Sequence, residues 1–248
     1  MEGIAGKVII VTGASSGIGE ASALQLGAGG ATIVATARRD DRLRDLEARI
    51  TAVGGTVLAF TTDITDEPQV RTMVQRTMER FGRIDVLVNN AGVMHNAPIS
   101  AAHTDDWRRM LDANVLGLAI ATQAVLPMMR AQGGGHIVNI SSVAGRVFSP
   151  SAAMYAATKA GVVGFSEALR KEVYKDRIRV TVVEPGVTAT ELPDHISDAA
   201  TQAGFRDWMA SMRPLQSEDI ARAIVFAIAQ PSHVGVNEIM IRPVDQER

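Results

Sequence analysis

The chain has 248 residues, 46% of them hydrophobic, and its 25 basic and 27 acidic residues leave a formal net charge of −2. This length and apolar content can bury a large core within one domain. The near balance of charge predicts neither nucleic acid nor an acidic membrane as a partner. The absence of cysteine excludes disulfides, thiolate catalysis and thiolate-bound metals.

The first residues, MEGIAGKVIIVTG, enter a strand-like run almost at once and lack the pattern of a secretory signal. No apolar run approaches the roughly 18–20 residues that a membrane span requires. We therefore expect a cytoplasmic protein.

Short β-branched runs alternate with longer amphipathic segments along the chain. The predicted strands are 7–13 (KVIIVTG), 31–37 (ATIVATA), 56–63 (TVLAFTTD), 84–90 (IDVLVNN), 135–142 (GHIVNISS), 178–186 (IRVTVVEPG) and 236–243 (VNEIMIRP). The predicted helices begin near Gly17, Arg39, Asp66, Thr104, Ala153 and Ser217. Because the strands are continuously apolar, helices should cover both faces of a parallel sheet. We predict one α/β domain over 1–248, with a doubly wound, seven-stranded parallel sheet.

The segment 188–214, here called the lid, interrupts this alternation. Its sequence, TATELPDHISDAATQAGFRDWMASMRP, contains no predicted strand, and its bulky residues are scattered. It follows the carboxyl end of a strand, which is where α/β sheets bind ligands. We predict that it covers a substrate; an ordinary pair of surface helices is the alternative.

A glycine-rich loop follows the first predicted strand. Glycines at this place allow a tight turn and let backbone N–H groups approach a pyrophosphate at the helix N-terminus, although a plain turn also uses glycine. The residues expected to bind a nucleotide here are Gly13, Ser15, Ser16, Gly17, Ile18 and Gly19.

The end of the second strand bears on the choice of nucleotide. Enzymes that prefer NAD usually present a carboxylate to the adenosine ribose at this point, but here Ala37 is followed by Arg38 and Arg39. Guanidinium groups suit a 2′-phosphate by charge and by geometry. The sequence therefore favours NADP(H) over NAD(H), read mainly by Arg38. Arg39 can also be interpreted as the start of an exposed helix.

Together, several motifs resemble the short-chain dehydrogenase/reductase family in its single-domain form, over essentially the whole chain. They are 12–19 (TGASSGIG), 89–92 (NNAG), Asn114 in MLDANVLG, Ser142 in NISSVAG, 155–159 (YAATK) and 185–190 (PGVTAT). The resemblance implies a Rossmann fold and further cofactor-binding residues: Asp63, Ile64, Asn90, Ala91, Gly92, Tyr155, Lys159, Pro185, Gly186, Thr188 and Thr190.

The pair Tyr155 and Lys159 carries the predicted chemistry. Four residues are one helical turn, so the two side chains share a helix face. A free tyrosine has a pKa of about 10, and a neighbouring cation should lower it toward neutral pH. The resemblance implies that Tyr155 exchanges a proton with the substrate and that Lys159 binds the nicotinamide ribose.

Two further residues complete the catalytic set that the resemblance implies. Ser142, thirteen residues before Tyr155, would donate a hydrogen bond to the substrate oxygen. Asn114 would hold a water that links Lys159 to solvent. Ser141 is the weaker candidate, because it breaks the usual spacing to the tyrosine.

The substrate wall and the chain end are less typical of the family. The expected substrate-binding residues are Met94, Val143, Phe148, Leu192, Trp208 and Met212, an apolar set that favours hydrophobic ketones or aldehydes. The ending VGVNEIMIRPVDQER resembles a bacterial subgroup that contains clavulanate dehydrogenase and NADP-dependent carbonyl reductases. A homotetramer is implied by the family. The five scattered histidines predict no catalytic metal.

The predicted function is reduction of a ketone or aldehyde to an alcohol with NADPH, reversibly. An NAD-dependent alcohol dehydrogenase with the same four residues is one alternative. A catalytically silent nucleotide-binding redox sensor is the other, but such a sensor would be expected to have lost a catalytic residue.

Overall fold

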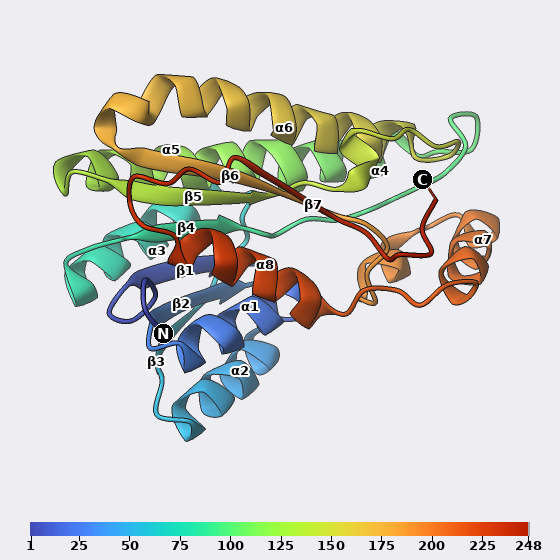
Figure 1. Ribbon diagram of the computed structural model, residues 1–248. Coiled ribbons are helices and arrows are strands. Elements are labelled where there is room, and N and C mark those ends of the chain that lie inside the picture. Colours follow the sequence, from blue (N-terminus) through green and yellow to red (C-terminus); the bar gives the residue numbers. More distant parts are fainter. Residues whose placement is uncertain (248) are drawn as a thin grey trace.

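A computed structural model of the chain describes residues 1–247; Arg248, the last residue of the domain expected over 1–248, lies outside the described residues. Within them, seven parallel strands form a sheet in the order β3-β2-β1-β4-β5-β6-β7 (Figure 1). The strands are β1 (Val8–Thr12), β2 (Thr32–Ala37), β3 (Thr56–Thr61), β4 (Val86–Asn89), β5 (Gly135–Ile140), β6 (Ile178–Pro185) and β7 (Glu238–Ile241). The predicted α/β fold and its seven-stranded parallel sheet are confirmed.

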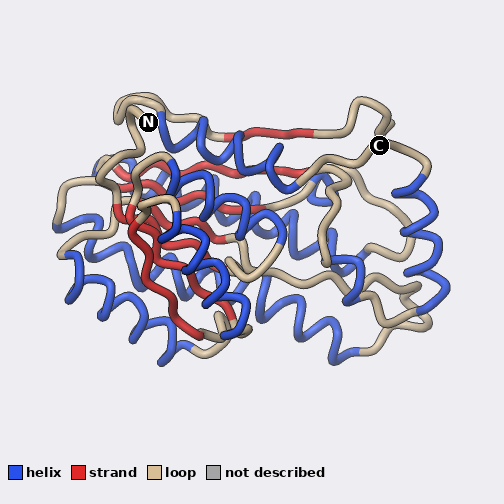
Figure 2. Tube along the Cα trace, turned by 90° about the horizontal axis from the view of Figure 1, so that it is seen from below, coloured by secondary structure: helices blue, strands red, loops and turns tan. Residues whose placement is uncertain are grey.

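Helices cover both faces of the sheet, as the continuous apolar strands predicted (Figure 2). They are α1 (Gly17–Ala28), α2 (Asp40–Ala52), α3 (Glu67–Phe81), α4 (Thr104–Leu111), α5 (Gly117–Ala131), α6 (Ala153–Val173), α7 (Ala199–Ala210) and α8 (Ser217–Ala229). Figure 1 shows α5 and α6 on one side of the sheet and α1, α2 and α8 on the other.

Two apolar cores form where the sheet packs against these helix layers, one on each face. In β1, Ile9 and Val11 pack toward α1, α2 and α8, whereas Val8 and Ile10 pack toward α3, α5 and α6. Successive residues of a strand point to opposite faces, so a strand covered on both sides must be apolar throughout. Packing on both faces fixes the positions of the strand ends.

A buried polar network ties the centre of the sheet to the helices above it. The Asn89 side chain of β4 donates to Asn139 Oδ1 at 2.9 Å and to Thr122 Oγ1 at 3.0 Å. Asn139 of β5 in turn donates to Ser166 Oγ of α6 at 2.8 Å. These bonds fix β4, β5, α5 and α6 relative to one another, directly beneath the strand ends that bear the predicted catalytic residues.

The helix predicted to begin near Thr104 is confirmed and continues to Ala131. A π-helical turn (Asp112–Leu116) joins α4 to α5 without a break. By length and composition the helix over 104–131 could cross a membrane, which contradicts the expectation that no apolar run approaches that length. Core helices of globular domains can be equally long and apolar, and α5 packs against α3 and the sheet.

We predict that Asn139→Ala lowers the free energy of unfolding by about 2 kcal/mol, because it removes one buried hydrogen bond from the amide of Asn89 and one from the hydroxyl of Ser166. Urea unfolding followed by circular dichroism measures the loss. Asn237→Ala, at an exposed position, is the control and should change the free energy by less than about 0.5 kcal/mol. Equal effects of the two changes would contradict the structural role of the network.

Candidate active site

A cavity of about 1120 Å³ opens at the carboxyl ends of the strands, between the sheet and the lid. The chain order reverses direction between the neighbouring strands β1 and β4, which is where open α/β sheets bind nucleotides. The predicted nucleotide-binding residues that line it are Gly13, Ser15, Ser16, Gly17, Ile18, Arg38, Arg39, Asp63, Ile64, Asn90, Ala91, Gly92, Tyr155, Lys159, Pro185, Gly186, Thr188 and Thr190. Gly19 is the predicted nucleotide-binding residue that is not part of this lining.

The glycine loop fits a phosphate group. Gly13 and Gly17 have φ values of 67° and 57°, a region that disfavours side chains, and a Cβ at Gly13 would lie 2.8 Å from the Ala91 backbone. The Ser16 side chain makes no capping bond to α1, so the first N–H groups of that helix remain available to an anion. Gly19 is needed for packing instead, because a Cβ there would collide with the Gly13 carbonyl.

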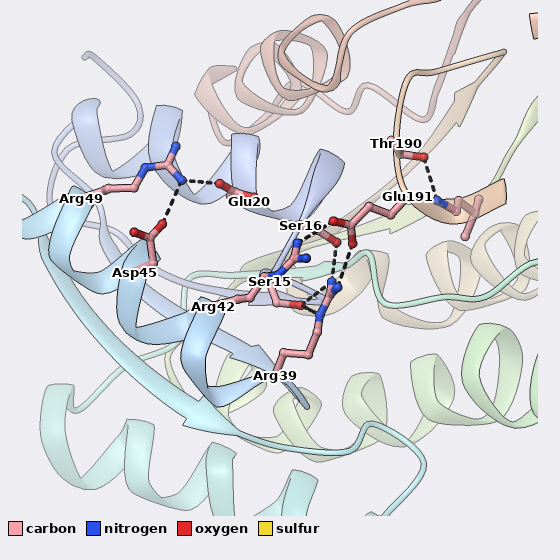
Figure 3. A network of polar contacts seen from close by, with 10 residues as sticks. Ser15, Ser16, Glu20, Arg39, Arg42, Asp45, Arg49, Thr190 and Glu191 are labelled. Atoms are coloured by element: carbon pink, nitrogen blue, oxygen red, sulfur yellow. Dashed lines mark hydrogen bonds and ion pairs between the residues drawn. The ribbon is translucent and has the colours of Figure 1, made fainter. Parts of the chain in front are cut away.

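Arg39, rather than Arg38, contacts the glycine loop. Its guanidinium donates to Ser15 Oγ at 3.0 and 3.1 Å and to Ser16 Oγ at 2.6 Å. It also pairs with Glu191 of the lid, as does Arg42 (Figure 3). Arg38 is exposed on the wall of the same cavity. The alternative that Arg39 merely begins an exposed helix is therefore incomplete, since it is the N-cap residue of α2 and also part of the site.

Ser142, Tyr155 and Lys159 lie together on the opposite part of the cavity. Tyr155 and Lys159 are 7% and 6% exposed on one face of α6, and Lys159 Nζ lies 5.7 Å from the centre of the Tyr155 ring. The same Nζ donates to the Ile140 carbonyl at 2.9 Å. Ser142 follows two residues after Ile140, so one strand end positions all three side chains.

The pKa of Tyr155 moves opposite to the sequence-based expectation. Burial raises it to about 12, and the side-chain hydrogen bond with Ser142 opposes that shift. Burial lowers the pKa of Lys159 to about 8. The predicted lowering of the Tyr155 pKa is therefore wrong for this structure, because desolvation of the phenolate outweighs the hydrogen bond with Ser142. At neutral pH, Tyr155 is a protonated phenol and Lys159 is mostly an ammonium.

Asn114 and Ser141 act on the backbone around the cavity. Asn114, in the π-helical turn, accepts from the Val93 N–H at 2.8 Å and donates to the Val93 carbonyl at 2.9 Å. Asn114 is 1% exposed and does not line the cavity, so its observed role is to hold the loop that follows β4 in place. The water relay through Asn114 stays a prediction. Ser141 donates to the Lys159 carbonyl at 2.8 Å, which is a structural role.

Four of the six predicted substrate residues line the cavity: Met94, Val143, Leu192 and Trp208. Phe148 is 70% exposed and Met212 lies after α7, and neither is part of the lining. For these two, apolarity near a motif was a misleading signal: Val147 and Ser149 line the cavity on either side of Phe148, whereas Phe148 itself faces solvent. The lid contains a 3-10 turn (Leu192–His195) and α7. Every residue of α7 is at least partly exposed.

The sequence analysis missed several residues of the site. Thr12 Oγ1 accepts from the N–H groups of Asn90 and Ala91 at 3.0 Å each, which ties β1 to the turn after β4. Gln246 Oε1 accepts from the Val187 N–H at 2.9 Å and brings the chain end to the cavity. Thr12 lay within the quoted glycine motif, whereas nothing in the sequence linked Gln246 to Val187.

We predict that the buried ammonium of Lys159 makes stability rise with pH. Its pKa of about 8 in the folded chain lies below the value of about 10.5 expected when unfolded, so between these values the unfolded chain binds more protons. Relative to Lys159→Met, the free energy of unfolding of the wild type should rise by about 2 kcal/mol from pH 7.5 to 10. Parallel urea titrations measure this difference, and identical pH profiles would contradict the burial of the charged group.

Comparison with known proteins identifies relatives that belong to the family whose motifs the site contains. The sequence profile of the short chain dehydrogenase family matches residues 7–201. An uncharacterized oxidoreductase of Staphylococcus saprophyticus is 40% identical over 248 residues, which cover 99% of both chains. A serine dehydrogenase complexed with NADP⁺ is 32% identical, with a TM-score of 0.90 over 97% of this chain and 96% of its own.

A second solved structure, a 7α-hydroxysteroid dehydrogenase complexed with NADH and 7-oxo glycochenodeoxycholic acid, is 28% identical, with a TM-score of 0.87 over 96% of this chain and 93% of its own. The resemblance to the clavulanate dehydrogenase subgroup stays a prediction. The profile match and the full-length relatives together show that the chain is an oxidoreductase of the short-chain dehydrogenase/reductase family.

Proposed function

We propose that this chain is an NADP(H)-dependent carbonyl reductase, which converts a ketone or aldehyde into an alcohol and runs in reverse when the alcohol is in excess. The observation that carries the proposal is the placing of Tyr155, Ser142 and Lys159 together in one cavity that continues to the glycine loop. We also propose that the chain forms a single Rossmann-fold domain, in which the lid covers the substrate.

The cavity suits a nicotinamide nucleotide, because it runs from the glycine loop to Tyr155 and offers hydrogen-bond donors along its length. The uncapped N-terminus of α1 would hold the pyrophosphate, and Asp63 and Ile64 would face the adenine. Lys159 would turn its ammonium to the nicotinamide ribose, while Thr188 and Thr190 would hold the carboxamide. Bound in this way, the reduced nucleotide supplies the hydride.

The proton comes from the chain. As negative charge develops on the substrate oxygen, Tyr155 donates its proton and Ser142 donates a hydrogen bond to the same atom. A phenol with a pKa of about 12 is still far more acidic than an aliphatic alcohol, so transfer to the alkoxide is downhill. The Lys159 ammonium beside the ring stabilises the phenolate that forms. Asn114 positions the turn that carries Gly92 next to Lys159.

The preference for NADP(H) rests on charge. Arg38 and Arg39 follow β2 where an acidic residue would otherwise meet the ribose hydroxyls, and Arg39 is already turned toward Ser15 and Ser16. Related enzymes are found with either nucleotide, NADP⁺ in the serine dehydrogenase and NADH in the hydroxysteroid dehydrogenase. The local arginines therefore support the choice more strongly than the family does.

The apolar lining by Met94, Val143 and Leu192 supports a hydrophobic substrate. The exposed apolar side chains of Phe226, Met240 and Val244, on α8 and around β7, support self-association, and we propose a homotetramer in the cytoplasm. The silent-sensor alternative has no supporting observation, because the four predicted catalytic residues are all present.

We predict that Tyr155→Phe lowers the turnover number by at least about 100-fold, because the phenylalanine cannot donate the proton. NADPH consumption with a panel of aryl ketones, cyclic ketones and aldehydes measures it, and the same panel with NADH tests the cofactor preference. NADPH binding to the variant, followed by fluorescence, is the control and should change less than about threefold. A variant that retains turnover near the wild-type rate would remove Tyr155 as the proton donor.

A further inference from the structure

A carboxylate of the lid sits between two arginines at the nucleotide end of the cavity. Glu191 accepts from Arg39 at 2.7 Å through one oxygen and from Arg42 at 2.5 Å through the other (Figure 3). The two arginines belong to the start of α2, whereas Glu191 lies about 150 residues further along the chain. This bridge thus joins the lid to the region that follows β2.

The bridge occupies a place that matters for the cofactor. Arg39 holds Glu191 while its other donors bond Ser15 and Ser16 of the glycine loop. Arg39 and Glu191 both line the large cavity, next to Arg38. A carboxylate held by paired guanidinium groups satisfies the same donors that a phosphate monoester would use.

We propose that Glu191 is a specificity-determining residue that competes with the 2′-phosphate of the cofactor for Arg39; Arg42, the second arginine of the bridge, lies outside the cavity lining. A nucleotide that carries the phosphate displaces the carboxylate and releases this end of the lid. A nucleotide without the phosphate leaves the bridge in place. This inference rests on the proposed binding of NADP(H) in this cavity.

The balance of charges allows the exchange. A phosphate monoester carries about 1.5 to 2 negative charges at neutral pH and offers three oxygens, against the single charge and two oxygens of Glu191. The side chains of Arg39, Arg42 and Glu191 are 43%, 44% and 41% exposed, so solvent screens the bridge and it can be broken at modest cost. The two arginines hold the pKa of Glu191 down at about 2, so the carboxylate stays charged throughout the neutral range.

The lid has a second attachment that the exchange leaves intact. Ser197 donates to Asp106 of α4 at 2.8 Å, and Ile196 beside it is buried against the cluster around Tyr155. Release of Glu191 therefore detaches the segment 191–195 from α2, while Gln202 and Arg206 of α7 still bond Pro193 and Asp194 within it. Leu192 and His195 of that segment line the cavity.

The direct test compares two small probes that carry the adenosine half of the cofactor. Titration calorimetry with 2′,5′-ADP and with 5′-AMP on the wild type and on Glu191→Gln should show about three- to tenfold tighter binding of 2′,5′-ADP to the variant. Binding of 5′-AMP should change less than twofold. Asp194→Asn is the matched control, because that lid carboxylate pairs with Arg206 within the lid and should alter neither affinity.

The variant-to-wild-type ratio decides the inference. Unchanged or weaker binding of 2′,5′-ADP to Glu191→Gln would overturn it, and so would an equal gain for 5′-AMP. The wild type alone tests the proposed cofactor preference: if it binds 2′,5′-ADP no better than 5′-AMP, the NADP(H) proposal fails whatever Glu191→Gln does. The two failures are therefore distinguishable.

Hydrogen exchange gives an independent readout of the lid. In the wild type, 2′,5′-ADP should speed amide exchange within 191–195, where the Asp194 N–H donates to the Glu191 carbonyl at 3.0 Å, and 5′-AMP should not. In Glu191→Gln, exchange there should be fast without any probe. Exchange that 2′,5′-ADP slows or leaves unchanged in the wild type would contradict release of the lid.

Discussion

The bond from the Lys159 ammonium to the Ile140 carbonyl is the interaction on which the site depends. It brings a buried charge from α6 to the carboxyl end of β5, and the Ser141 hydroxyl reinforces the junction by donating to the Lys159 carbonyl. Ser142 is the next residue along the chain, and Tyr155 is one helical turn before Lys159. A shift of α6 along the sheet would therefore break the ion's hydrogen bond and separate the phenol from the serine at the same time.

The two ends of the cavity differ in how far solvent reaches their titratable side chains. At the catalytic end, Tyr155 and Lys159 are almost fully buried, and desolvation sets the direction of both pKa shifts. At the nucleotide end, arginines and Glu191 are nearly half exposed, and their pairing is exchangeable. Burial thus disfavours the charged forms of Tyr155 and Lys159 at the catalytic end, whereas the solvent-exposed charges at the nucleotide end can exchange partners at modest cost.

Periodicity and motif spacing were enough to predict the sheet, its helix layers and the shared face of Tyr155 and Lys159. These features depend on local patterns, which a single chain displays directly. The direction of the Tyr155 pKa shift could not be predicted, because the burial of the phenol depends on segments distant in sequence. The Arg39–Glu191 bridge was missed for the same reason, since an exposed arginine and a lid glutamate carry no local signal of pairing.

The errors at the substrate wall have a different cause. Phe148 and Met212 were chosen for apolarity beside motifs, but loop residues can point either way, and Phe148 faces solvent. The apolar length of the helix over 104–131 was not predicted, because a π-helical turn carries polar Asp112 and Asn114 through an otherwise apolar segment. Both errors arise where the backbone leaves regular geometry, which is also where functional residues concentrate.

Transfer of deuterium from the cofactor to the product tests the central claim most directly. NADPH that carries deuterium at both C4 positions would be incubated with the wild-type protein and a reactive aldehyde or aryl ketone, and the alcohol would be analysed by mass spectrometry. We expect one deuterium on the carbinol carbon, retained in ordinary water, with the hydroxyl proton exchanging freely. An alcohol without carbon-bound deuterium would contradict direct hydride transfer, and no alcohol from any carbonyl compound despite tight NADPH binding would contradict reductase activity itself.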